Sequence, residues 1–212
     1  MQAADSILIV LLLTNFFILG TANLRASIRV VAVQGILLSL LPIFVESEAT
    51  VRLIVLVIAT AAIKGALIPA LLLKAIREVH IRHEVEPYLG FIPSLFLCTI
   101  GTGLALLFGD QLPLAPQHRD ALFVPAALAT LLAGFLVLTT RRKAISQVTG
   151  YLMLENGIFL FGLTQSPRVP FLVEIGVLLD VFVGVFIMGI VVFHINREFD
   201  SISASRLSEL RD

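Results

Sequence analysis

Long apolar stretches, separated by short polar segments, make up nearly all of the chain. They cover residues 6–22, 28–45, 51–74, 91–109, 121–140, 144–164 and 170–195. Each is close to the roughly 17 to 25 residues that a helix needs to cross a hydrocarbon core about 30 Å thick. Lipid offers no partner to backbone polar groups, so a segment inside it must satisfy its own hydrogen bonds as a helix. The pattern predicts an all-α integral membrane protein with about seven transmembrane helices.

The positions of Lys and Arg predict the orientation of these helices. One side of the predicted membrane region holds most of them, and the other side holds only Arg52, Arg119 and Arg168. The richer side has Arg25, Arg29, Lys74, Arg77, Arg82, Arg141, Arg142, Lys143, Arg197, Arg206 and Arg211. Basic loops stay in the cytoplasm. We therefore expect the N-terminus outside and the C-terminus in the cytoplasm, which requires an odd number of helices.

Composition supports a membrane domain and excludes several functions. The chain is 58% hydrophobic and 14% charged, whereas soluble domains average about 45–50% apolar and about 25% charged residues. A net charge of +0 provides no basic field for nucleic acid. Cys98 is the single cysteine, so an internal disulfide or a thiolate metal site is excluded. Asp5, with no basic residue before the first apolar run, predicts a retained span and not a cleaved signal peptide.

Ionisable residues inside the predicted spans are the strongest functional signal. Lys64, Glu155 and Asp180 each fall in the middle of an apolar stretch. At the helical rise they lie about 15 to 21 Å from the cytoplasmic ends, near the membrane midplane. An acid there costs roughly 2.5–3.5 kcal/mol on insertion, so it needs a functional reason. The pattern predicts a lateral row of ionisable groups that moves protons or cations.

The surroundings of these groups predict how they are held. A low dielectric favours the neutral form of Glu155 unless a cation or hydrogen bonds compensate. Lys64 is too deep to reach either interface, so we expect it to pair with a carboxylate, either of this chain or of another subunit. Five other polar residues inside spans are predicted to form hydrogen bonds between helices. These are Asn15, Gln34, Thr60, Thr149 and Asn156.

Small residues surround the third ionisable group. Gly176, Asp180 and Gly184 follow one another at intervals of four residues and share one helix face. Small residues allow another helix to approach closely, so this face should pack on protein and turn Asp180 away from lipid. The alternative is that Asp180 only forms a hydrogen bond that sets helix packing.

Motifs for bond-making chemistry are absent from the sequence. It contains no phosphate-binding Gly loop, CxxC, HExxH or nucleophile motif. His80 and His83 lie in a predicted cytoplasmic loop, but their spacing matches no usual zinc pattern, which favours a solvated loop or a docking surface. We expect no catalytic site, no cofactor and no metal in this chain.

The order of features repeats along the chain. Gly150 follows Gly35 by 115 residues, and Asp180 follows Lys64 by 116 residues. Such offsets indicate a parallel repeat of helical units. We therefore expect an N-terminal three-helix unit over 1–90, a connecting helix and outer loop over 91–118, and a C-terminal three-helix unit with a cytoplasmic tail over 119–212.

The C-terminal unit resembles a known type of subunit. A basic turn, then the segment Gly150-Tyr-Leu-Met-Leu-Glu155-Asn156-Gly157, then Asp180 with Gly184 in a last helix, is similar to the K-type membrane subunit of respiratory complex I. It is also similar to the C-type subunit of multisubunit cation/proton antiporters. The whole chain resembles the hydrogenase-4 component E family of group 4 membrane-bound hydrogenases. Asp180 matches the last-helix acid of the K-type pattern, whereas Glu155 is displaced by about one turn from its other acid.

The resemblance implies a non-catalytic subunit of a hydrogenase-4-like or complex-I-like oxidoreductase, in the bacterial or archaeal cytoplasmic (inner) membrane. Its partners would be other membrane subunits, antiporter-like ones included, and redox chemistry would belong to other chains. Glu155, Asp180 and Lys64 would relay protons, with Gln34 and Asn156 as supporting polar groups. Two alternatives stay open. The chain is then either a structural subunit whose polar groups specify packing, or a transporter, autonomous or part of a multisubunit antiporter.

Overall fold

The computed structural model describes residues 2–45, 50–78, 87–109 and 122–165, together with Val183, Gly184, Phe186 and Gly189. These ranges are helical, with short connections. The elements are α1 (Gln2–Gly20), α2 (Leu24–Val45), α3 (Val51–Ala62), the π-helix η1 (Ile63–Leu67), α4 (Ile68–Glu78), α5 (Phe91–Gly109), α6 (Phe123–Thr140) and α7 (Ala144–Gln165). The all-α prediction is confirmed for these ranges.

The first six predicted spans all correspond to helices, and α3, η1 and α4 together form one continuous rod. Four helical segments are long and apolar enough to cross a membrane, and the apolar part of α1 is shorter. The four are Leu24–Phe44, Val51–Arg77, Phe91–Gly109 and Phe123–Thr140. Most of the predicted span 170–195 lies outside the described residues, so the count of seven, the orientation and the division into units stay predictions.

Helix boundaries differ from the apolar stretches where a polar residue begins or continues a helix. The predicted span 28–45 begins too late, because α2 starts at Leu24 and includes the basic residues Arg25 and Arg29. The side-chain oxygen of Asn23 accepts hydrogen bonds from the backbone N–H groups of Arg25 and Ala26, at 3.1 and 3.3 Å. This is an N-cap, which satisfies backbone donors that a helix start leaves unpaired. Hydropathy predicts the apolar part of a helix, whereas the N-cap residue determines where the helix begins.

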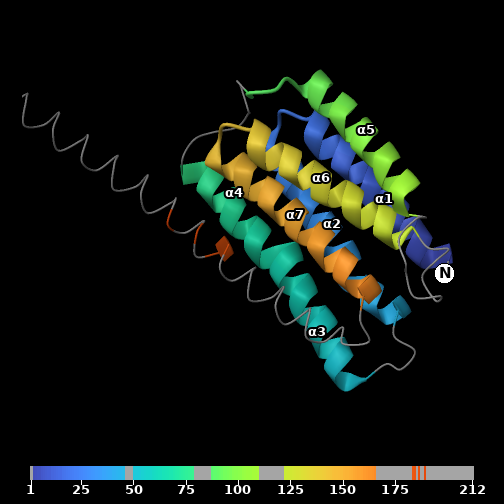
Figure 1. Ribbon diagram of the computed structural model, residues 1–212. Coiled ribbons are helices and arrows are strands. Elements are labelled where there is room, and N and C mark those ends of the chain that lie inside the picture. The colour runs from blue at the N-terminus through green and yellow to red at the C-terminus, as the bar shows by residue number, and fades with distance from the viewer. Residues whose placement is uncertain are drawn as a thin grey trace, which may run out of the picture.

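The helices lie side by side with their axes roughly aligned (Figure 1). The helices α6 and α7 pack most intimately; α1 packs on α6 and α2, and α2 also packs on α7. At one edge of the bundle α5 packs on α6 and α1, and at the opposite edge the rod α3–η1–α4 packs on α2 (Figure 1). Helices distant in sequence therefore meet in the interior.

Three glycines bring the backbones of α6 and α7 into direct contact. A Cβ atom at Gly134 would lie 2.4 Å from the backbone nitrogen of Leu154, and one at Gly150 would lie 2.5 Å from that of Leu138. A Cβ at Gly157 would likewise lie 2.7 Å from a backbone nitrogen of α6. Backbone atoms cannot give way as a flexible side chain can. Small residues thus set the position of α7, as they do in many membrane helix pairs.

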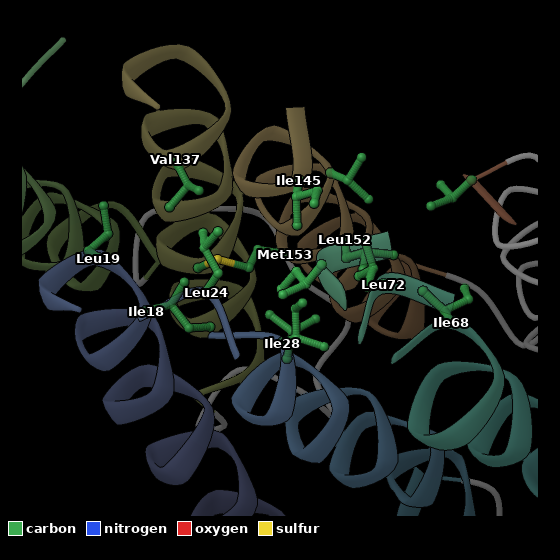
Figure 2. Close-up of a cluster of buried hydrophobic side chains, with 14 of the residues drawn as sticks. Ile18, Leu19, Leu24, Ile28, Ile68, Leu72, Val137, Ile145, Leu152 and Met153 are labelled. Atoms are coloured by element: carbon green, nitrogen blue, oxygen red, sulfur yellow. The ribbon is translucent and has the colours of Figure 1, made fainter. Parts of the chain in front are cut away.

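Two apolar clusters fill the interior. The first joins α1, α2, α4, α6 and α7; its members include Ile18, Leu19, Leu24, Ile28, Ile68, Leu72, Val137, Ile145, Leu152 and Met153 (Figure 2). The second lies towards the other end of the bundle and includes Leu8, Leu11, Leu38, Leu41, Ala126, Leu160 and Leu163. Along α1, α2, α6 and α7, a polar stretch separates the two clusters. That stretch is the candidate site.

Candidate functional site

Six buried polar residues from five elements lie between the two apolar clusters, and we call them the polar layer. None is more than 7% exposed. They are Asn15 of α1, Gln34 of α2, Lys64 of η1, Thr130 of α6, and Glu155 and Asn156 of α7. Apolar packing at both ends keeps this layer from bulk solvent. Its polar atoms must therefore find partners within the protein or with trapped water.

The centre of the polar layer is an ion pair. Lys64 Nζ donates to Glu155 Oε1 at 2.6 Å, and the two side chains are 5% and 4% exposed. The two residues are 91 positions apart in the sequence. The sequence left open whether Lys64 pairs within the chain or with another subunit, and the structure shows a partner within the chain. A short contact between ionised groups is among the stronger hydrogen bonds of proteins.

A π-helical turn positions Lys64. The N–H of Ile68 bonds to the carbonyl of Ile63, five residues earlier, which is the π pattern. Pro69 follows directly and has no N–H, so the carbonyl of Gly65 loses its usual helical donor. The proline offers a sequence-level cause for the irregular turn, and π-turns inside α-helices are frequent at functional sites.

Two glycines let the side chain of Lys64 cross between helices. A Cβ atom at Gly35 of α2 would lie 2.7 Å from Lys64 Cβ and 3.6 Å from Lys64 Cδ. A Cβ at Gly65 would lie 2.5 Å from Ile36 Cγ1. The stem of Lys64 therefore runs over the bare backbone of Gly35 on its way to α7. A larger residue at that position would occupy the space of the lysine stem.

Hydrogen bonds continue from Lys64 through the rest of the polar layer. Lys64 Nζ also donates to Asn156 Oδ1 at 3.3 Å. Asn156 Nδ2 donates to Gln34 Oε1 at 3.2 Å, and Gln34 Nε2 donates to Asn15 Oδ1 at 2.8 Å. Asn15 Nδ2 donates to Thr130 Oγ1 at 2.9 Å. The series is continuous and links five elements.

The direction of this series follows from the ammonium group. A charged lysine can only donate, so Asn156 must turn its oxygen towards Lys64 and its nitrogen towards Gln34. The same constraint then orients Gln34 and Asn15 in turn. Reversing any one amide would place two donors or two acceptors against each other. The charge on Lys64 thus sets the orientation of three amide dipoles.

The predicted residues fall into three groups. Lys64, Glu155, Gln34 and Asn156 are brought together. The proton-transfer roles of Lys64 and Glu155 and the supporting roles of Gln34 and Asn156 stay predictions. Asp180 and Gly176 lie outside the described residues. Gly184 is partly buried, and a Cβ there would be 3.8 Å from Leu71 Cδ1, an ordinary van der Waals contact.

The expectation of hydrogen bonds between helices is confirmed for Asn15, Gln34 and Asn156 and is wrong for Thr149. Thr149 Oγ1 donates to the carbonyl of Ile145 one turn earlier in α7, at 3.0 Å. A threonine hydroxyl can satisfy itself within its own helix, which residue type alone does not reveal. Thr60 Oγ1 is buried and has no hydrogen-bond partner among the residues that the structure describes.

Sequence reasoning missed the location of Arg141. It was counted with a cytoplasmic basic turn, yet it is 3% exposed. Its Nη2 donates to the carbonyl of Leu19 at 2.6 Å, near the C-terminal end of α1, and its guanidinium lies 4.5 Å from the ring centroid of Phe91. A cation at a helix C-terminus complements the helix dipole. Arg141 therefore joins α1, α5 and the α6–α7 turn, and nothing in the sequence separates it from the neighbouring Arg142 and Lys143.

Thr130, at the far end of the polar layer, was missed as well. Its only sequence signal is a hydroxyl residue inside an apolar span, and such residues are common in membrane helices. Within the described ranges, His, Cys, Asp and Glu side chains do not gather in groups of three or more that could hold a metal ion.

Comparison with known proteins gives the family. No protein-family model matches the chain, and no solved structure is significantly similar to it. It is 34% identical over 206 residues to an uncharacterised protein of Mycobacterium tuberculosis, covering 95% of this chain and 93% of that protein. It is 26% identical over 204 residues to hydrogenase-4 component E of Escherichia coli K12, covering 95% and 94% of the two chains, and to the Shigella flexneri protein of that name equally. This multi-pass membrane protein thus belongs to the same family as the mycobacterial protein, and it is similar to hydrogenase-4 component E over nearly its whole length.

Proposed function

We propose that this protein is a non-catalytic membrane-arm subunit of a hydrogenase-4-like or complex-I-like assembly, and that its polar layer takes part in proton translocation. The redox chemistry that drives this transport would occur in other subunits. The observation that carries the proposal is the buried contact of 2.6 Å between Lys64 and Glu155. Similarity to hydrogenase-4 component E over 95% of the chain supports the assembly.

A buried ion pair is a poor choice for stability alone. Removing two charges from water costs several kcal/mol per ion, and a well-packed apolar pair is often at least as stable. The pair is, however, well suited to hold a mobile proton. At 2.6 Å the nitrogen and oxygen are within the distance over which a proton passes between an acid and a base. The pair can change from two charged groups to two neutral groups without any net charge entering the membrane interior.

Glu155 has a second oxygen that is free for proton exchange. Oε1 accepts from Lys64, whereas Oε2 is buried and has no hydrogen-bond partner among the described residues. Leaving a buried carboxylate oxygen without a hydrogen-bond donor costs free energy, so such an atom calls for a functional explanation. It provides a position at which a proton can arrive while Oε1 stays in contact with the ammonium.

Asp180 completes the proposed relay. It is the acid of the last predicted span and lies outside the described residues, so its place is argued from the sequence alone. We assign it the next proton position beyond the Lys64–Glu155 pair, towards antiporter-like partner subunits. Coupled titrating groups respond to each other's charge, which lets redox events elsewhere shift the Lys64–Glu155 proton. The bacterial or archaeal cytoplasmic (inner) membrane is part of this proposal.

The test uses Glu155→Gln in the assembled complex, in inverted membrane vesicles. The amide still accepts a hydrogen bond from Lys64 but cannot titrate. We expect electron transfer to an artificial acceptor to continue and proton pumping to be lost. The matched control is Asp5→Asn, the same change in the first turn of α1, which should pump normally. Normal pumping by Glu155→Gln would refute the relay.

A structural role is the second candidate, because the hydrogen bonds of the polar layer join five elements. In that case the layer specifies which helices pack together. Glu155→Gln would then lower the amount of assembled complex while each remaining complex pumped normally. Measuring pumping per assembled complex, quantified by the co-purifying subunits in mild detergent, separates the two functions.

A further inference from the structure

Two small cavities lie next to the polar layer, one on each side of Lys64 along the rod α3–η1–α4. The first, which we call the Thr60 cavity, has a volume of about 10 Å³ and is lined by Ser39, Pro42, Val57, Thr60 and Phe159, among others. The second, the Ile68 cavity, also has about 10 Å³ and is lined by Val31, Gly35, Lys64, Ile68, Leu152 and Asn156. A cavity of this volume holds about one water molecule.

The Thr60 cavity lies one helical turn from the ion pair. Thr60 precedes Lys64 by four residues, and Phe159 follows Glu155 by four residues. One turn of a helix advances about 5.4 Å. The cavity is therefore within reach of Glu155 through one water molecule and the hydroxyl of Thr60.

Unpaired polar groups beside the Thr60 cavity indicate a bound water. Thr60 is 4% exposed, and its Oγ1 has no hydrogen-bond partner among the described residues. A buried hydroxyl left unpaired costs about 1–3 kcal/mol, and buried waters usually bond to such groups. Ser39 Oγ donates to the carbonyl of Ile36 at 2.7 Å and keeps its acceptor capacity. Pro42 has no N–H, so the carbonyl one turn earlier in α2 lacks its helical donor.

The Ile68 cavity is bordered by two polar members of the layer. Lys64 and Asn156 both line it, next to the apolar side chains of α2, α4 and α7. A water there can accept a hydrogen bond from the ammonium of Lys64. It would lie on the lysine side of the ion pair, whereas the Thr60 water would lie a turn away in the opposite direction along the rod.

We infer that each cavity holds one water molecule and that protons, and not sodium ions, reach the ion pair through the Thr60 cavity and leave through the Ile68 cavity, or the reverse. This inference rests on the proposed function. Hard cations bind in cages of several oxygen atoms. Each cavity has room for one water, and the ammonium of Lys64 already occupies the cation position at Glu155 Oε1.

The proton steps balance. A proton arriving by way of the Thr60 water binds Glu155 Oε2 and neutralises the carboxylate. Lys64, now without its counter-charge, releases one proton to the Ile68 water and becomes a neutral amine. The carboxyl group of Glu155 then rotates so that its proton faces Lys64, the proton passes to Nζ, and the charged pair is restored. One proton has entered and one has left, and no electron has moved.

The first test is Thr60→Val in the assembled complex, which removes the hydroxyl at nearly constant volume. Proton pumping per electron transferred should fall by about 10- to 100-fold, within the range that a positioned proton-transfer group contributes. Thr60→Ser should restore pumping, because it restores the hydroxyl. Thr99→Val is the control, since among the described residues that hydroxyl donates within its own helix α5, to the carbonyl of Leu95. Normal pumping by Thr60→Val would overturn the inference.

Glu155→Gln separates this inference from the function on which it rests. Loss of pumping in Glu155→Gln with normal pumping in Thr60→Val would leave the proposed function standing and reject the Thr60 route. Normal pumping in both variants would reject the proposed function. The ion is tested by varying sodium in the vesicle buffer: pumping should be unchanged, and pumping that requires sodium would overturn the choice of protons.

A second measurement detects the water directly and does not depend on pumping. Cys98 is the single cysteine of the chain, so Cys98→Ala gives a background without thiols. In it, Thr60→Cys should react with Ag⁺, a probe that travels through water. Ala129→Cys should not react, because Ala129 is 2% exposed and lines neither cavity. If the thiol of Thr60→Cys reacts with Ag⁺ no faster than that of Ala129→Cys, the inference that the Thr60 cavity holds water is overturned.

Discussion

The Lys64–Glu155 contact predicts strong thermodynamic coupling between two residues that are 91 positions apart. At 2.6 Å, two unit charges attract each other by about 6 kcal/mol with an effective dielectric constant of about 20. Desolvation of the two groups offsets much of this gain. Replacing one partner leaves the other charge buried and uncompensated. We therefore expect Lys64→Met or Glu155→Leu to destabilise the protein by about 3–5 kcal/mol each.

The double variant should be much less damaged than either single variant. With both charges gone, the site holds two apolar side chains, and Asn156 loses one donor. The combined cost should stay below about 2 kcal/mol, because apolar replacement of both partners is often neutral. The two substitutions should therefore depart from additivity by at least about 4 kcal/mol, above the upper end of about 3 kcal/mol for residues in contact.

Unfolding of the purified chain in mild detergent measures these effects. The chain has no Trp, so loss of helical circular dichroism is the signal. The control pairs Lys64→Met with Asp5→Leu, an acid in the first turn of α1, and these two changes should add. If the losses from Lys64→Met and Glu155→Leu also add, the side chains do not form the buried pair and the reasoning is refuted.

The remaining predictions use the same measurement. Gly150→Ala should cost about 1–3 kcal/mol or more, since its Cβ would meet the backbone of α6, whereas Gly103→Ala should cost little because nothing lies within 4 Å. Arg141→Gln should cost about 1–3 kcal/mol through the lost bond to Leu19 and the lost contact with an aromatic ring. Thr130→Val should cost about 0.6–2 kcal/mol, because the last amide of the polar layer loses its acceptor.

Each of these three has a distinct contrary outcome. Equal stability of the Gly150→Ala and Gly103→Ala variants would show that α6 and α7 are not in backbone contact. An unchanged Arg141→Gln variant would place the guanidinium in solvent. A stabilised Thr130→Val variant would mean that the hydrogen-bond series ends before α6.

Much of the fold could be predicted from local patterns, and the details that failed have identifiable causes. The six described spans follow hydropathy closely, but α2 begins earlier than its apolar stretch because Asn23 caps it. The π-turn at Lys64 has a local cause in Pro69, yet its consequence is not local. The turn can direct Lys64 towards α7 only because Gly35, on the helix α2, has no side chain in the path of the lysine stem.

The sequence by itself determined the class of the protein and the identity of its unusual residues. Insertion into lipid depends on the apolar character of each segment, which is a sum over its residues. The sequence alone therefore predicts the transmembrane spans and the charged residues inside them. Only the tertiary structure decided that Lys64 meets Glu155, that three amides align behind the ammonium, and that Arg141 is buried. Periodicity tells which face of a helix a residue occupies, but which helix packs against that face depends on close contacts that glycines allow, such as those of Gly134 and Gly150 between α6 and α7 and that of Gly35 with the Lys64 side chain.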